Sequence, residues 1–269
     1  MNITVTWGGM TDEAPRIFSP DYYTRMGANE AGSWWNAAMR ENAARLLQRA
    51  GLPAHGVALD VGCGTGQTMS WLRALKPAWR CMGIDVAPEG LQLARARGEV
   101  VMRASALELP VDCASVDLVV TLDVVQHLPH PAGDLMALAE MRRVLRPGGL
   151  LLLRTNAQGF PRTVDDPEAM FRKYDAPSLA RKLDASGFDT VRLSRVNALL
   201  GLAEIPRELR ARQESGTSGY HGLLAAPRQP TRADRLKRWW LELEGRAVAA
   251  GVRLPAGRAI LALCRARGS

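Results

Sequence analysis

Two carboxylates and three closely spaced glycines are the residues of this 269-residue chain that could do chemistry together. The glycines alternate in LDVGCGTGQT, residues 59–68, directly after an apolar run that ends in Asp60. Glycine lets a ligand approach the backbone closely and adopts positive φ angles without steric cost. Asp85 stands 19 residues after Gly66, at the end of a second apolar run. A carboxylate there can accept both hydroxyls of a ribose, so the pattern indicates a nucleotide-type cradle.

The spacing of the glycines distinguishes between kinds of nucleotide ligand. A dinucleotide fingerprint reads GxGxxG, but Gln67 stands where its third glycine would be. The chain also has no GxxxxGK[ST] phosphate loop. A GxGxG loop fits an adenosine ligand with a zwitterionic methionine tail and no pyrophosphate. An NAD-dependent oxidoreductase of the same fold class is the alternative, although no hydride-transfer residue set is recognisable.

The elements that must position these residues alternate along the chain between strand-like and helix-like segments. Such alternation predicts an α/β fold with a parallel sheet, whose ligands bind beyond the carboxyl ends of the strands. The expected strands are 57–61, 81–85, 99–103, 116–122, 150–156, 189–196 and 259–265. The expected helices are 30–49, 67–76, 87–98, 133–145 and 175–186. About sixty residues before the last strand are too many for a plain connection and predict a helical insertion.

Five segments in order carry a family resemblance: LDVGCGTG, GIDVAP, ASALELPV, VDLVVTLDVVQHL and LRPGGLLLL. From about residue 57 to 197 the chain resembles the class I S-adenosylmethionine-dependent methyltransferases, of the type 11 kind. The resemblance implies a Rossmann-like seven-stranded sheet of order 3-2-1-4-5-7-6 with the last strand antiparallel. It also implies a lid from the N-terminal helices and the insertion. The expected domains are a helical lid segment (1–56), the core (57–197), a helical cap (198–257) and the last core strand (258–269).

The same resemblance implies S-adenosylmethionine as cofactor and S-adenosylhomocysteine as product. Asp85 would hold the ribose and Asp60 the amino group, although Asp60 could equally cap the following loop. Many relatives have an acid where this chain has Ser105, which can still accept a hydrogen bond from the adenine. Cys63 lies in the loop and is otherwise a small packing residue. The expected cofactor residues are Asp60, Gly62, Cys63, Gly64, Gly66, Asp85, Val86, Ser105, Ala106, Leu107, Leu122 and Asp123.

One of the four histidines, His127, follows the fourth expected strand, where the ligand crevice should lie. It could act as a general base for a hydroxyl acceptor, or be a packed histidine of the QHLPH turn. Aromatic rings suit a sulfonium or a flat acceptor, although at least one tryptophan of the N-terminal helix is expected in the core. The expected pocket residues are Tyr22, Tyr23, Trp35, Gln126 and Tyr174.

The charge distribution and the cysteines indicate which partners, disulfides and metal sites to expect. The net charge is +8, and residues 201–269 hold 13 Lys and Arg against 6 Asp and Glu. RLKRWWLELEG, residues 235–245, mixes basic and aromatic residues. It predicts a lid helix, with weak membrane-surface or nucleic-acid contact as the other readings. The four cysteines form no CxxC pair and do not cluster with histidines, so we expect no disulfide and no metal site.

The sequence therefore predicts methyl transfer from S-adenosylmethionine to an oxygen or nitrogen of a secondary metabolite, a sugar or a lipid-linked metabolite. No Asn/Asp-Pro-Pro-aromatic motif and no Pro-Cys pair is present, which favours a small molecule over nucleic acid. An RNA methyltransferase that uses the basic C-terminal region is one alternative, and a cofactor-binding protein without catalysis is another. Without an apolar run of 18 residues or a secretory signal, we expect a cytoplasmic monomer or homodimer.

Overall fold

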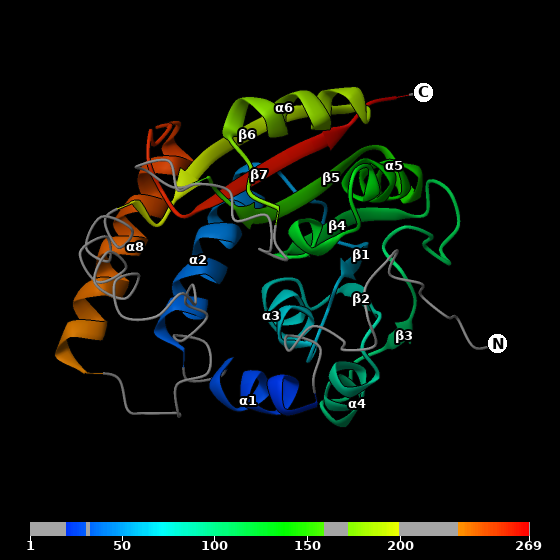
Figure 1. Cartoon of the computed structure of the whole chain (residues 1–269), viewed down its shortest axis with the longest axis horizontal. Coiled ribbons are helices and arrows are strands. Elements are labelled where there is room, and N and C mark those ends of the chain that lie inside the picture. Colours follow the sequence, from blue (N-terminus) through cyan, green and yellow to red (C-terminus); the bar gives the residue numbers. More distant parts are fainter. Residues whose placement is uncertain (1–19, 31–32, 159–171, 199–230, 269) are drawn as a thin grey trace.

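A seven-stranded sheet forms the centre of the protein (Figure 1). The computed structural model describes residues 20–30, 33–158, 172–198 and 231–268. The strand order is β3-β2-β1-β4-β5-β7-β6, and only β7 is antiparallel to its neighbours. The predicted order and the antiparallel last strand are therefore confirmed. The strands are β1 (Gly56–Val61), β2 (Trp79–Asp85), β3 (Val101–Arg103), β4 (Val116–Leu122), β5 (Leu145–Asn156), β6 (Phe188–Val196) and β7 (Ala259–Ala266).

Apolar side chains of the central strands point alternately to two cores, one on each face of the sheet. Leu59 of β1 and Val119 of β4 belong to one core, whereas Ala58 and Leu118 belong to the other. Strands buried on both faces read as continuous apolar runs, as VDLVVTL does. The first core is covered by α5 (Gly133–Val144) and α6 (Ala176–Ala185). The second is covered by α2 (Trp34–Arg49), α3 (Gln67–Leu75) and α8 (Arg232–Ala250).

The N-terminal segment differs from its prediction, because two helices stand in place of one that begins at Glu30. They are α1 (Pro20–Glu30) and α2, and α2 has its own N-cap. The Ser33 Oγ accepts a hydrogen bond from the Asn36 N–H at 3.2 Å. A serine in this position satisfies a helix-end donor and marks a new start. The predicted helix 30–49 corresponds to α2, which begins four residues later, and the sequence analysis did not predict α1.

Strand β5 also begins earlier than predicted, at Leu145 instead of residue 150. Leu145 pairs with Val116, the register then shifts, and regular pairing resumes between Leu150 and Leu118. Gly148 has φ +79°, which suits an irregular stretch. The RPGG segment that predicts a turn is thus an irregularity within one long strand.

The insertion before β7 contributes α8, while residues 199–230 lie outside the described part. The Thr231 side chain and Asp234 form a capping box at its start. The Asn42 Nδ2 of α2 donates to the Leu241 carbonyl of α8 at 3.1 Å, and the two helices pack side by side. At Gly245, a Cβ would lie 1.6 Å from Asn42 Oδ1, so glycine is required for this approach. The predicted helical character of the insertion therefore holds for its second half.

None of the described helices is long and apolar enough to cross a membrane. All four cysteines are free thiols. Within the described ranges, no cluster of three or more His, Cys, Asp or Glu residues could hold a metal ion.

Candidate active site

The loop between β1 and α3 depends on glycine at every second position. Gly62, Gly64 and Gly66 have φ angles of 79°, 49° and 81°, in the left-handed region that glycine favours. At Gly62 a Cβ would also lie 2.2 Å from Val124 Cγ2. The N–H groups of Gly62 and Cys63 donate to the Ile84 carbonyl at 2.7 and 3.0 Å, so the end of β2 holds the loop. The loop is therefore rigidly placed at the carboxyl edge of the sheet.

Asp85 closes β2 beside this loop. Its Oδ2 accepts from the Gly64 N–H at 2.8 Å and its Oδ1 from the Ala87 N–H at 2.9 Å. Burial raises the pKa of this carboxyl, and the backbone N–H donors of Ala87, Gly64 and Val86 oppose that rise. Each carboxylate oxygen has a further lone pair, so Asp85 can still accept from a ligand. The carboxylate is thus fixed in position before any ligand arrives.

Asp60, at the end of β1, is buried and forms no ion pair with any residue in the part of the chain that the structure describes. Its Oδ2 finds no hydrogen-bond partner among the described residues. Burial raises the pKa of the Asp60 carboxyl well above its usual range, and the nearby Asp85, Glu30 and Glu99 carboxylates add to the rise. An unpaired buried carboxylate is costly unless a cation or donor joins it. The site therefore favours a ligand that brings positive charge.

Helix α1 lies over the glycine loop. Tyr23 is buried with its ring against two glycines: a Cβ on Gly90 would lie 2.9 Å from its Cε1, and one on Gly64 4.0 Å. Burial and the Asp85 carboxylate raise the pKa of the Tyr23 hydroxyl, so this group stays protonated. Tyr22 stands edge-on to Tyr23, with ring centroids 5.6 Å apart. Burial, Asp123 and Glu30 raise the Tyr22 pKa to about 12, so this hydroxyl also stays protonated at neutral pH.

Arg97, just after α4 (Pro88–Ala96), ties α1 to the loop. Its Nη1 donates to the Thr65 carbonyl and Oγ1, both at 3.0 Å, and its Nη2 donates to the Gly27 carbonyl of α1 at 3.3 Å. Glu30, also on α1, accepts from the Thr65 Oγ1 and lies 3.7 Å from Arg97 Nη1. We call Arg97, Glu30, Thr65 and Gly27 the α1 latch. No sequence motif marks it, because its members come from three segments.

The carboxyl ends of β4 and β5 carry a second group of side chains. Asp123 has a positive φ of 60°, which aspartate tolerates better than most residues. Its carboxylate accepts a two-pronged hydrogen bond from Arg154 of β5. The Arg154 guanidinium also lies over the Trp35 ring, 4.8 Å from its centroid. Arg154 was not predicted as a site residue. A charged residue within the apolar run LLLLRTN is the sequence feature that could have indicated it.

His127 follows β4 in a short 3-10 helix, Val125–His127. Burial lowers its pKa to about 4, against the opposing effect of Asp123, so the imidazole is neutral at neutral pH. Its Nε2 lies 3.4 Å from the Gln126 Nε2. The Gln126 Oε1 accepts from the Thr155 Oγ1 at 3.0 Å and from the Asn156 N–H at 2.9 Å. Gln126 therefore fastens the histidine segment to the end of β5.

The site thus has two halves. We call the glycine loop with Asp60, Asp85 and the segment after β3 the cofactor half. We call Tyr22, Trp35, Asp123, His127 and Arg154 the acceptor half. The two halves meet where Val124 packs against Gly62.

The chain is similar to known proteins across this architecture. Residues 59–153 match the family model of a methyltransferase domain. Over 145 residues the chain is 35% identical to the trans-aconitate 2-methyltransferase of Azoarcus sp. (strain BH72), covering 53% of this chain and 54% of that protein. Over 102 residues it is 30% identical to the tRNA (carboxymethyluridine(34)-5-O)-methyltransferase of Arabidopsis thaliana, covering 38% and 24%. The chain thus spans about half or less of these relatives.

A solved structure shows the same fold. A chain of the Haloferax volcanii complex between the Trm112 methyltransferase activator and a methyltransferase superposes with a TM-score of 0.61. The identity is 18%, over 95% of this chain and 100% of the other. The domain match and the sheet order agree on one family.

Residues 59–153 therefore form a methyltransferase domain of the class I S-adenosylmethionine-dependent type. S-adenosylmethionine carries a sulfonium and an ammonium group. The cofactor half holds two buried acidic side chains, Asp60 and Asp85, and neither forms an ion pair with a residue that the structure describes. A Cβ on Gly62, Gly64 or Gly66 would lie 3.1 Å or less from a neighbouring side chain, so the loop is closely packed. The residues present therefore fit this cofactor: Asp85 toward ribose hydroxyls and Asp60 toward the ammonium group.

The remaining expected cofactor residues lie around this methyltransferase loop. The Ser105 Oγ accepts a hydrogen bond from the Leu107 N–H at 3.1 Å, so the hydroxyl stabilises the turn in which Ser105 lies. Ala106 is buried in the core, and Leu107 packs against it. Cys63 is buried, and burial raises the pKa of its thiol, which keeps it un-ionised. Val86 and Leu122 are both partly buried, after β2 and at the end of β4 respectively.

Tyr174, another expected pocket residue, is buried beside the segment that contains Val125 and Gln126. It is 2% exposed and belongs to the apolar core. Its hydroxyl donates to the Asp134 Oδ2 at 3.0 Å and lies 3.2 Å from the Val125 carbonyl. Asp134 also forms ion pairs with Arg172 and Lys182 at 2.6 and 2.8 Å. Tyr174 thus supports the segment that carries His127 from beneath.

Proposed function

We propose that this chain transfers the methyl group of S-adenosylmethionine to an oxygen or nitrogen of a small-molecule acceptor, such as a secondary metabolite, a sugar or a lipid-linked metabolite. One observation carries the proposal. Two buried carboxylates, Asp60 and Asp85, flank a glycine loop that α1 covers, and Asp60 has an oxygen without a partner among the described residues. That arrangement suits a cationic nucleoside and not a pyrophosphate.

The cofactor, when bound, supplies an electrophilic methyl group. The chain's own residues then orient the acceptor and exclude water, which can provide much of the rate. Tyr23 is buried against the loop and Tyr22 stands edge-on to it. The guanidinium of Arg154, near the end of β5, lies over the ring of Trp35 from α2. A flat or ring-shaped acceptor would lie well between these groups.

His127 is the group we assign to proton handling. The Asp123 carboxylate is engaged by Arg154, so it is less suited to accept a proton. The His127 imidazole is neutral at neutral pH, because burial lowers its pKa to about 4. A neutral imidazole can accept a hydrogen bond from an acceptor hydroxyl and then its proton as the methyl is transferred. Such a weak base suits an acidic hydroxyl, and a neutral amine would need no base.

An RNA acceptor is the second candidate. It is favoured by residues 201–269, which contain 13 basic and only 6 acidic residues. It would show itself as binding that falls steeply with salt, because phosphate contacts release counterions. The aromatic side chains of Tyr22 and Tyr23 beside the glycine loop, and of Trp35 beside Arg154, support a small-molecule acceptor instead.

The test is transfer of labelled methyl from S-adenosylmethionine into fractionated small-molecule extract and, separately, into total RNA. We expect label in a small-molecule fraction, and mass spectrometry then identifies the product. Calorimetry with S-adenosylhomocysteine and with NAD measures which cofactor is bound. Label only in RNA would overturn the choice of acceptor, and binding of NAD alone would overturn the activity.

A further inference from the structure

Helix α8 has a second apolar face, directed away from the protein. Its inner face packs on α2 and the sheet through Leu241 and Val248. On the opposite side, Leu236, Trp239 and Leu243 are 57%, 52% and 41% exposed. Their spacing of three and four residues places them in one stripe. Trp240 flanks the stripe at 40% exposure and stands edge-on to Trp239, 5.0 Å between ring centroids.

Arginines extend the same stripe at both ends. Arg232 and Arg235 precede the apolar residues by one helical turn, and Arg246 follows Leu243 by three residues; all three are exposed. The acidic residues of α8 do not offset them, because Asp234 and Glu244 are buried and Glu242 is paired with Arg238 at 2.7 Å. We call Arg232, Arg235, Leu236, Trp239, Trp240, Leu243 and Arg246 the α8 outer face.

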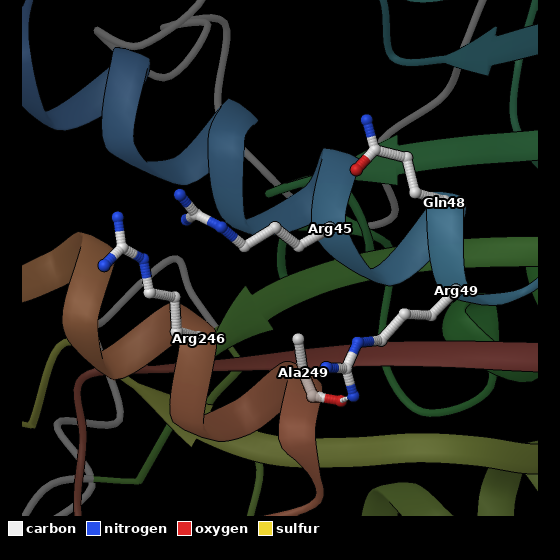
Figure 2. A pocket seen from close by; sticks show the side chains of 5 residues that line it. All are labelled: Arg45, Gln48, Arg49, Arg246 and Ala249. Atoms are coloured by element: carbon white, nitrogen blue, oxygen red, sulfur yellow. Dashed lines mark hydrogen bonds between the residues drawn. The ribbon is translucent and has the colours of Figure 1, made fainter.

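A groove beside the C-terminal end of this face adds more positive charge. Figure 2 shows it between α2 and α8, lined by Arg45, Gln48, Arg49, Arg246 and Ala249. Its volume is about 370 Å³. Arg45 is paired with Glu41 at 3.0 Å, and Arg49 donates to the Ala249 carbonyl at 2.6 Å. Arg246 has no hydrogen bond or ion pair with any residue that the structure describes.

We propose that the α8 outer face docks on the surface of a bilayer that contains anionic phospholipids. A bilayer presents phosphate groups above an apolar interior, which matches arginines around exposed tryptophan and leucine side chains. In this arrangement Leu236, Trp239 and Leu243 enter the boundary between headgroups and acyl chains. Arg232, Arg235 and Arg246 contact phosphate groups, and the groove with Arg45 and Arg49 receives one headgroup. The proposal is independent of the methyl acceptor.

Two other occupants fit this face less well. A second copy of the chain related by a two-fold axis would bring the same arginines against each other. A single-stranded RNA could stack bases on the tryptophans, but Leu236 and Leu243 offer no aromatic surface for stacking. A bilayer is the partner that uses the aliphatic, aromatic and cationic groups together.

The test is co-sedimentation of the full chain with vesicles of phosphatidylcholine alone and of phosphatidylcholine mixed with phosphatidylglycerol. We expect binding to the mixed vesicles only, and weaker binding as salt is raised. The triple variant Leu236→Ser/Trp239→Ser/Leu243→Ser should bind about ten-fold more weakly or not at all. Each of Arg232→Gln, Arg235→Gln and Arg246→Gln should weaken binding about five-fold.

The matched control is Met136→Ser/Val191→Ser, which removes apolar side chains of similar exposure, 52% and 46%, from elements other than α8. It should bind vesicles like the unchanged chain. Calorimetry with S-adenosylhomocysteine shows that every variant is folded. The proposal is overturned if mixed vesicles are not bound, or if the triple serine variant binds them as the unchanged chain does. It is also overturned if the face instead mediates binding to single-stranded RNA or self-association by light scattering.

Discussion

The cofactor half and the acceptor half of the site are built in different ways. In the cofactor half, the functional groups lie within one stretch of about fifty residues, from Asp60 to Leu107. Their geometry follows from three left-handed glycines and from backbone N–H groups that hold Asp85. In the acceptor half, Tyr22, Trp35, His127 and Arg154 come from four separate elements. Side chains that pack on one another, and not a backbone conformation, set its geometry.

This difference indicates which half of the site can accept substitutions without losing its geometry. A backbone cradle requires particular residue types at fixed spacing, so it stays recognisable in a sequence. A pocket of packed side chains tolerates substitution and can be reshaped for another acceptor. The two halves are nevertheless joined at two places, the Gly62–Val124 contact and the α1 latch. The following changes test that junction and each half.

The largest effect is expected from Gly62→Ala, at the contact between the halves. The new Cβ would meet Val124 Cγ2 at 2.2 Å and would hold alanine at φ 79°. A left-handed alanine costs about 1–2 kcal/mol and overpacking about 1–3 kcal/mol, so we expect a loss of about 2–5 kcal/mol in the free energy of unfolding. Urea denaturation measures it.

Gly51→Ala is the matched control, because Gly51 has φ 72° with nothing within 4 Å of a Cβ. Gly51→Ala should lower the free energy of unfolding only by the cost of placing alanine in the left-handed conformation, about 1–2 kcal/mol. Adding Val124→Ala to Gly62→Ala should restore part of the loss. If Gly62→Ala costs no more than Gly51→Ala, the two halves are not in tight contact.

The next effect is confined to the cofactor half. Asp85→Ala removes the carboxylate that we assign to the ribose. Charge-assisted hydrogen bonds contribute about 1.5–3 kcal/mol each, so the affinity for S-adenosylhomocysteine should fall about 100-fold. Calorimetry measures it, with Asp189→Ala as control, since the Asp189 side chain is 64% exposed on β6. An unchanged affinity in Asp85→Ala would remove the ribose assignment.

A smaller effect on both halves is expected from Arg97→Ala, which opens the α1 latch. Tyr23 of α1 packs against the glycine loop of the cofactor half, and Tyr22 of α1 belongs to the acceptor half. Loosening α1 should therefore affect both halves. We expect cofactor affinity to fall about ten-fold and trypsin to cleave faster at Arg25 in α1. Arg95→Ala is the control, because Arg95 is an exposed residue of α4 only two positions before Arg97. Equal cleavage rates in the two variants would show that Arg97 does not hold α1.

The smallest effect belongs to His127→Gln, in the acceptor half. Burial lowers the pKa of His127 from 6.5 to about 4, so the unfolded chain binds more protons between these pH values. The unchanged protein should therefore lose stability as the pH falls below 6.5, and His127→Gln should lose less. Urea midpoints at pH 7 and pH 5 measure this, with the exposed His55→Gln as control. If both variants show the pH dependence of the unchanged protein, His127 is not held in its neutral form.

Several structural features could be predicted from local patterns, and others could not. The strands, the glycine loop and the acidic ends of β1 and β2 follow from short apolar runs and turn residues, whereas the strand order was implied by the family resemblance. The break between α1 and α2 was missed, although Ser33 is a good N-cap. Gln126 was expected in the pocket, but its Oε1 is engaged by Thr155 and Asn156. Nothing in the sequence marks that contact, because the partners lie 29 and 30 residues away.

The sequence by itself determined the fold and the cofactor half, because φ angles, strand burial and N–H donors depend on residues close together in the chain. Only the tertiary structure decided the acceptor half, the α1 latch and the α8 outer face. These depend on which distant segments meet, and on which side of a helix the core covers. A periodic apolar pattern such as that of α8 has two candidate faces, and packing chooses the one that is buried.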